Sequence, residues 1–168
     1  MAQQVSSNVF AAVGDGWGKS AMAHGYVARG WGLGWRCLVV QFVKGPDWHP
    51  GIEAYARELG VEWEVFGAGM TWGSSPRRDP VSRAVATWSL AADRLRSGEY
   101  RLIVLDEIGL ALAYGWLEVD TVIAGVTERA AGTNVILTAP ELPPALLALA
   151  DVVTTFERTR GGGGTPLR

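Results

Sequence analysis

A glycine-rich stretch followed by one lysine and one serine carries the clearest chemical signal in this chain. Gly14, Gly16 and Gly18 alternate with other residues, and Lys19 and Ser20 follow directly. Glycines let the backbone curl tightly, so that several N–H groups come close to an anion. The lysine adds a positive charge for a phosphate, and the serine hydroxyl is suited to a magnesium ion. The residue types therefore predict a phosphate-binding loop.

The sequence on either side of residues 14–20 has the layout that such a loop needs. An apolar run at 9–13 precedes it, and a helix-compatible segment at 21–29 follows it. A helix start adds unpaired N–H groups and the positive end of the helix dipole. The pattern G-x-x-x-x-G-K-[ST] would place its first glycine where Val13 stands. Two interpretations stay open at this point: a nucleotide-binding loop, or a glycine-rich turn that binds nothing.

A second motif lies at the end of the buried run 101–107, which closes on Asp106 and Glu107. In a doubly wound sheet, ligands bind at the carboxyl ends of the strands, and a carboxylate there can hold magnesium beside Ser20. The plain alternative is a strand that ends in two solvated acids. Together with the lysine loop upstream, the pair favours a site for magnesium and a nucleoside triphosphate.

A third stretch, residues 66–72, has no ordinary role in nucleotide hydrolysis. It contains Gly67 and Gly69, whose backbone can approach a ligand closely, and Met70 and Trp72, which offer a soft, flat apolar surface. On residue types alone, a loop that caps the core explains it better.

Composition limits the class of protein. The chain has 168 residues and a formal net charge of -2, which argues against a dedicated nucleic-acid binder. We expect one domain over 1–157 and a flexible glycine-rich tail over 158–168. The single cysteine, Cys37, lies among apolar residues, which predicts a buried thiol and fits a reducing cytoplasm. No apolar run reaches transmembrane length, so we expect a cytoplasmic protein with no membrane partner.

Strand and helix patterns alternate along the whole chain. Strands are predicted at about 8–13, 36–43, 61–66, 101–107, 133–138 and 151–157. Helices are predicted at about 19–30, 52–59, 80–97, 108–114, 118–130 and 143–150. The helix at 80–97 is expected to bury one face, made of Val81, Val85, Trp88, Ala92 and Leu95. This order predicts an α/β fold with a largely parallel, doubly wound sheet.

Several spaced stretches, taken together, resemble one family. They are Gly14-Asp15-Gly16-x-Gly18-Lys19-Ser20, Val39-Val40-Gln41-Phe42-Val43-Lys44-Gly45, Gly67-x-Gly69-Met70-Thr71-Trp72 and Val104-Leu105-Asp106-Glu107, with Ala113-Tyr114 beyond. Over about residues 8–156 the chain resembles the ATP:corrinoid adenosyltransferases of cobalamin biosynthesis and salvage, which act on cob(I)yrinic acid a,c-diamide or cob(I)alamin. The second and third stretches are specific to that family, whereas many nucleotide-binding enzymes share the others.

The resemblance implies a RecA-like P-loop fold, a homodimer and a flavoprotein as reductant. It implies that the cobalt(I) of a corrinoid attacks the 5′ carbon of ATP, so that no side chain acts as nucleophile. The family's ATP-binding positions correspond to Gly14, Asp15, Gly16, Trp17, Gly18, Lys19, Ser20, Gln41 and Lys44. Its corrinoid-binding positions correspond to Gly69, Met70, Thr71 and Trp72. Its magnesium-binding positions correspond to Ser20, Asp106 and Glu107.

The chain also departs from the family pattern. Trp17 stands where the family has a second lysine, Ala21 replaces a hydroxyl residue, and Met70 replaces a phenylalanine. Ala139-Pro140 stands where the family has a glycine-arginine pair, and residues 160–168 do not carry its C-terminal Gly-Ile-Asp/Glu-aromatic pattern. The alternative is therefore a degenerate paralogue that binds ATP or a corrinoid without turnover. An ordinary P-loop NTPase or kinase ranks third, because it leaves the family-specific stretches unexplained.

Overall fold

Six strands form one parallel sheet in the computed structural model, which describes residues 7–43, 51–65 and 79–160. The strands are β1 (Val9–Val13), β2 (Cys37–Gln41), β3 (Glu62–Val65), β4 (Leu102–Asp106), β5 (Asn134–Thr138) and β6 (Val152–Thr155). Their order across the sheet is β3-β2-β4-β5-β1-β6, and every neighbouring pair is parallel. The strand β5 therefore lies between the strand that leads into the glycine loop and the strand that ends in Asp106.

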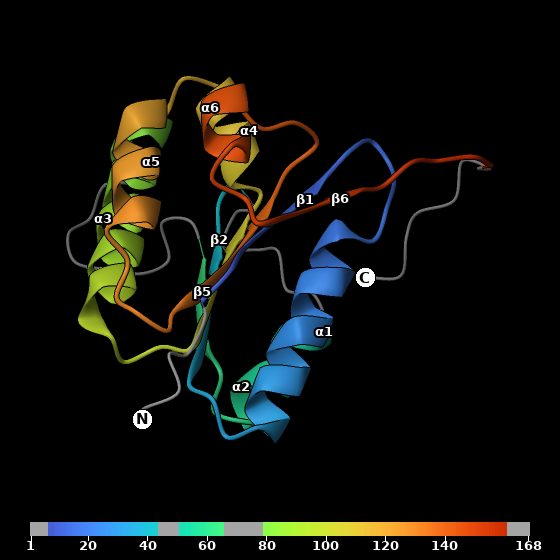
Figure 1. Ribbon diagram of the computed structural model, residues 1–168, viewed down its shortest axis with the longest axis vertical. Helices are drawn as coiled ribbons and strands as arrows, with labels where there is room; N and C mark the ends of the chain where they lie inside the picture. The colour runs from blue at the N-terminus through green and yellow to red at the C-terminus, as the bar shows by residue number, and fades with distance from the viewer. Residues whose placement is uncertain (1–6, 44–50, 66–78, 161–168) are drawn as a thin grey trace.

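Helices cover both faces of the sheet. On one face lie α1 (Lys19–Gly32) and α2 (Gly51–Glu58). On the other lie α3 (Pro80–Ser97), α4 (Ile108–Ala113), α5 (Val119–Thr127) and α6 (Pro144–Leu147), as Figure 1 shows. Within the described part of the chain, no helix combines the length and the apolar character needed to cross a bilayer. The arrangement confirms the expected α/β class with a parallel, doubly wound sheet.

The central strands are buried along their whole length because helices exclude water from both of their faces, and they are apolar except at their ends. All residues of β2, β4 and β5 are buried, and each expected strand and helix is present within a few residues of its predicted bounds. The edge strand β3 alternates between half-buried and buried residues, which confirms its half-covered pattern. Cys37 is buried, and this burial raises the pKa of its thiol to about 11.

The buried face of α3 differs from the predicted one. Val81 and Val85 are 40% and 52% exposed, so the expectation that they face the core is wrong. The buried residues are Ala84, Thr87, Trp88, Ala91, Ala92 and Leu95. The register follows from packing against α5, because a Cβ added at Gly125 would lie only 2.5 Å from the Trp88 ring. Because Gly125 has no side chain, the Trp88 indole packs against α5, and the small residues of α3 face the core.

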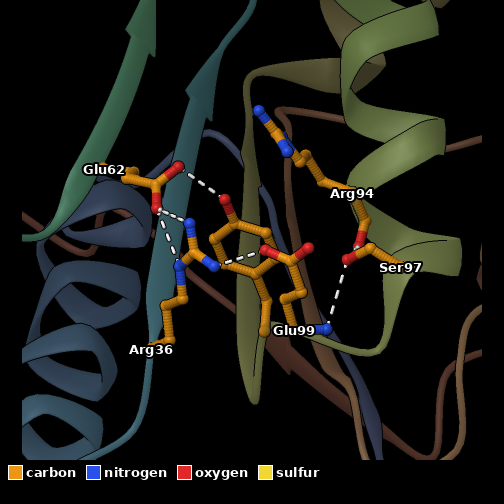
Figure 2. Close-up of polar contacts among 6 residues, drawn as sticks. Arg36, Glu62, Arg94, Ser97 and Glu99 are labelled. Carbon is orange, nitrogen blue, oxygen red and sulfur yellow. Dashed lines mark hydrogen bonds and ion pairs between the residues drawn. The ribbon is translucent and has the colours of Figure 1, made fainter.

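A polar cluster ties the amino ends of β2, β3 and β4 together (Figure 2). Arg36 contacts Glu62 at 2.6 Å and also pairs with Glu99, and its guanidinium carbon lies 4.6 Å from the centre of the Tyr100 ring. The Tyr100 hydroxyl donates a 2.5 Å hydrogen bond to Glu62. Burial, followed by this bond, raises the pKa of Tyr100 to about 12. The cluster holds these three strands together at the amino end of the sheet, whereas the glycine loop lies at the carboxyl end.

Candidate functional site

The glycine loop turns the chain from β1 into α1. Gly14 and Gly18 have φ values of 107° and 110°, a left-handed region that side chains rarely tolerate. A Cβ on Gly14 would lie 2.3 Å from the carbonyl oxygen of Phe156, and one on Gly16 would lie 2.7 Å from the carbonyl carbon of that residue. Gly14 also donates its amide to the Pro140 carbonyl at 2.8 Å. Both the backbone angles and the close approach of neighbouring chain therefore require glycine here.

The start of α1 presents the groups expected of a phosphate site. The first backbone bond of the helix runs from the Met22 amide to the Gly18 carbonyl at 2.8 Å. The amides of residues 19–21 precede that bond, and such amides have no partner within a helix. The Lys19 ammonium donates to the Gly14 and Gly16 carbonyls, at 2.7 Å each, and so lies folded over the loop. The amides of residues 19–21 and the Lys19 ammonium together form a positively polarised site for a phosphate.

Lys19 lies in an environment that pulls its pKa in two directions. Burial lowers the pKa of its ammonium below the usual value, while the nearby carboxylates of Glu107, Asp15 and Asp106 act in the opposite sense. Asp15 is exposed at the tip of the loop, and Glu107 is half-buried. A phosphate would add negative charge beside Lys19 and so favour its charged form further.

Asp106 accepts hydrogen bonds from side chains of three other elements, α1, β2 and β5. It is fully buried at the end of β4, and its Oδ1 accepts hydrogen bonds from the hydroxyls of Ser20 and Thr138, at 2.7 Å each. Its Oδ2 accepts from the Gln41 amide nitrogen at 3.2 Å. A buried carboxylate that accepts several donors is held in one orientation. The sequence-predicted pair of Ser20 and Asp106 is thus brought into direct contact, with the serine hydroxyl oriented by the acid.

Gln41 has a different environment from the one expected of a nucleotide contact. Its side chain is fully buried, and its amide oxygen accepts a 3.0 Å hydrogen bond from the indole nitrogen of Trp63. The amide nitrogen faces Asp106. Both ends of the amide are therefore engaged by protein groups, and Gln41 links β3 to the site through β2.

Thr138 and Trp63 belong to this network and were not predicted. Thr138 ends the buried strand β5, so a polar residue at the carboxyl end of an apolar run was a usable signal. No comparable signal exists for Trp63. It reaches Gln41 because β3 pairs with β2, with Trp63 opposite Val39, and that pairing is not visible in the sequence.

Glu107 stands at the turn from β4 into α4. Its backbone is left-handed, with a φ of 62°, and its amide donates to the Thr138 hydroxyl at 2.9 Å. Left-handed geometry is uncommon for a residue with a side chain, and such residues cluster at functional sites. The turn places Glu107 on the loop side of the sheet, close enough for its charge to act on the Lys19 ammonium.

The residue types at this centre fit a magnesium ion. In the described ranges, no group of three or more His, Cys, Asp or Glu side chains is placed to hold a metal. Magnesium does not need such a cage, because it usually keeps several waters and binds through one or two carboxylates and the phosphates of the substrate. The Ser20 hydroxyl donates a hydrogen bond to Asp106, so the lone pairs of its oxygen stay available for a cation.

Some expected site residues cannot be placed. Lys44, Gly69, Met70, Thr71 and Trp72 lie outside the described residues, as do positions 161–168 of the expected tail. Trp17 is described and is 52% exposed on the glycine loop. A cavity of about 240 Å³ lies at the opposite end of the sheet, lined in part by Asn8, Arg101 and Asn134 at the amino ends of β1, β4 and β5. It is therefore separate from the centre around Asp106.

Comparison with known proteins gives one consistent result. The model of the ATP:corrinoid adenosyltransferase BtuR/CobO/CobP family matches residues 6–161. A corrinoid adenosyltransferase of Pseudomonas aeruginosa is 40% identical over 143 residues, covering 84% of this chain and 70% of that protein. The corrinoid adenosyltransferase CobA of Salmonella typhimurium is 32% identical over 153 residues, covering 91% and 78%. The Escherichia coli corrinoid adenosyltransferase is 31% identical with the same coverage.

A solved structure also matches, at a level that shows only a general likeness. Domain III of the Thermotoga maritima replication initiation protein DnaA has a TM-score of 0.45 and 12% identity, covering 89% of this chain. The match spans 54% of the length of that chain.

Proposed function

The chain belongs to the ATP:corrinoid adenosyltransferase family, and from this premise we propose that it transfers the 5′-deoxyadenosyl group of ATP to the cobalt(I) of a corrinoid. Cobalt(I) supplies an electron pair to the 5′ carbon, and a cobalt–carbon bond forms. The bond from that carbon to oxygen breaks, and its electrons leave with inorganic triphosphate. The step needs no proton transfer and no protein nucleophile.

The observation that carries the proposal is that Lys19, Ser20 and Asp106 lie together at the carboxyl end of the sheet. Triphosphate is a poor leaving group unless its growing charge is neutralised, and prearranged donors do this best. The Lys19 ammonium and the first amides of α1 supply such donors. A bound magnesium ion would neutralise phosphate charge. Ser20 and Glu107 would hold it, and Asp106 would orient the Ser20 hydroxyl toward it. The remaining task of the protein is to hold ATP still beside the corrinoid.

The finer parts of the proposal follow the family resemblance. We propose that Gly69, Met70, Thr71 and Trp72 contact the corrinoid, that Lys44 contacts ATP, and that the active form is a cytoplasmic homodimer with a flavoprotein reductant. Sedimentation velocity tests the dimer directly. A Trp72→Ala variant that binds cobalamin as tightly as the parent chain would argue against the assignment of the corrinoid loop.

The decisive experiment is an anaerobic assay with magnesium-ATP and chemically reduced cob(I)alamin. Loss of the cobalt(I) absorbance, release of triphosphate and a light-sensitive product are expected together. Ser20→Ala and Lys19→Ala should lower the rate about 100-fold, because each removes a group that acts on the leaving triphosphate. Ser97→Ala is the matched control, since that hydroxyl is exposed and bonds to nearby backbone, donating to the Arg94 carbonyl and accepting from the Glu99 amide.

The outcomes separate the readings that the sequence left open. Turnover by the parent chain, lost in the Ser20 and Lys19 variants, supports the transferase. Binding of ATP or cobalamin with no product would instead identify a degenerate paralogue. Release of inorganic phosphate from ATP without corrinoid would favour an ordinary NTPase.

A further inference from the structure

The segment that follows β6 packs directly along the phosphate loop. The Phe156 amide donates to the Val13 carbonyl at 2.7 Å, and the Phe156 carbonyl accepts from the Gly16 amide at 2.8 Å. The Phe156 ring lies 3.2 Å from where a Cβ of Gly18 would be. These contacts fix residues 156–158 beside the loop, and they also occupy one loop amide that would otherwise be open to a phosphate.

Arg158 is brought to the loop by this packing. Its guanidinium carbon lies 5.2 Å from the centre of the Trp17 ring, which is the geometry of a cation–π contact. Arg158 forms no ion pair with any residue in the described ranges. Trp17 itself lies between Gly16 and Gly18 and is 52% exposed. A cation that has no carboxylate partner among the described residues is thus held on the loop that leads into Lys19.

A second cation beside Lys19 would help to neutralise the negative charge of a bound triphosphate. Lys19 is the only lysine of the glycine loop, and its ammonium already donates to two loop carbonyls. Triphosphate carries several negative charges, and an arginine fork can bond two phosphate oxygens at once. An arginine on an aromatic face keeps its edge N–H groups available, because the ring occupies only its flat side.

We propose that Arg158 supplies a second cation to the triphosphate of the nucleotide, and that Trp17 acts by holding the Arg158 guanidinium in place. Arg158 is then a substrate-binding residue, whereas Trp17 is a positioning residue that does not stack on adenine. The inference rests on the proposed function, because it assigns the cation to the same nucleotide site.

Calorimetric titration with inorganic tripolyphosphate and with magnesium-ATP tests the proposal. Arg158→Gln should weaken both ligands by about tenfold, the lower end expected for a charged contact at a partly exposed site. Arg158→Lys should recover part of the loss, and higher salt should shrink the difference between variants. Arg160→Gln is the matched control, since that arginine is exposed two residues further on and should change affinity less than twofold.

A second pair of variants tests the role given to Trp17. Trp17→Leu should weaken tripolyphosphate about threefold in the parent chain and should have no further effect when Arg158 is already Gln. Weaker ATP binding with unchanged tripolyphosphate binding would overturn the proposal and point to adenine stacking instead.

The proposed function and this inference fail in different ways. A parent chain that adenosylates cob(I)alamin, with Arg158→Gln as tight as the parent for both ligands, overturns only the role of Arg158. A parent chain that binds neither ligand and yields no adenosylated product overturns both.

Discussion

Replacing Gln41 by leucine tests whether the chain from Trp63 through Gln41 to Asp106 acts as one unit. Leucine is apolar and somewhat smaller than glutamine, so it removes both polar ends of the side chain. In the Gln41→Leu variant, the Trp63 indole loses its 3.0 Å acceptor and Asp106 loses its 3.2 Å donor. Trp63 is 3% exposed, and Asp106 has no exposed surface, so water cannot replace either partner.

The expected cost follows from these two losses. A buried donor without a partner costs about 1–3 kcal/mol, and a hydrogen bond to a charged group contributes about 1.5–3 kcal/mol. Ser20 and Thr138 still donate to the other oxygen of Asp106, so the second loss falls at its lower end. A total near 3 kcal/mol is expected, which lowers Tm by about 6–12 °C for a chain of this size. Magnesium-ATP should also bind more weakly, because Asp106 is less firmly oriented.

Urea unfolding followed by circular dichroism measures this effect, and a double-mutant cycle with Trp63→Phe isolates the coupling. The double variant should be more stable than the sum of the single effects by about 1–2 kcal/mol, because no buried indole donor is then left unpaired. Trp31→Phe is the control for the aromatic change, since that indole is exposed and bonds to the Leu59 carbonyl. Additive single effects would refute the reasoning.

Three further predictions follow from single sites. Gly109→Ala should destabilise by about 1–3 kcal/mol in urea unfolding, because its Cβ would lie 2.3 Å from that of Ala139, whereas Gly25→Ala meets nothing within 4 Å and should stabilise by about 0.5–1 kcal/mol. Thr138→Val should cost about 2–4 kcal/mol and slow adenosyl transfer, because it removes a donor to Asp106 and an acceptor for the Glu107 amide; unchanged unfolding would contradict this. The pKa of Cys37 is about 11 when folded, above its ordinary value of 9.0, so the folded state keeps this proton longer. Stability measured against pH should therefore fall between about pH 9 and 11, by less in Cys37→Ala.

The sequence alone located the phosphate loop and its acidic partner because both signals are local. Alternating glycines before Lys19 need no knowledge of distant chain, and neither does an apolar run that ends in Asp106. The order of strands and helices was also predicted correctly, since periodicity is a property of neighbouring residues. The family followed from the same motifs, and the comparisons confirm it.

Only the tertiary structure decided which side chains complete the site. Thr138 and Gln41 reach Asp106 because β5 and β2 flank β4 in the sheet, and Trp63 reaches Gln41 because β3 pairs with β2. Strand order depends on pairing between distant segments. The buried face of α3 was likewise set by the space that Gly125 leaves for Trp88. Arg158 reaches Trp17 because β6 pairs with β1 and delivers residues 156–158 onto the loop. Such contacts join positions far apart in the chain, and local sequence patterns therefore do not predict them.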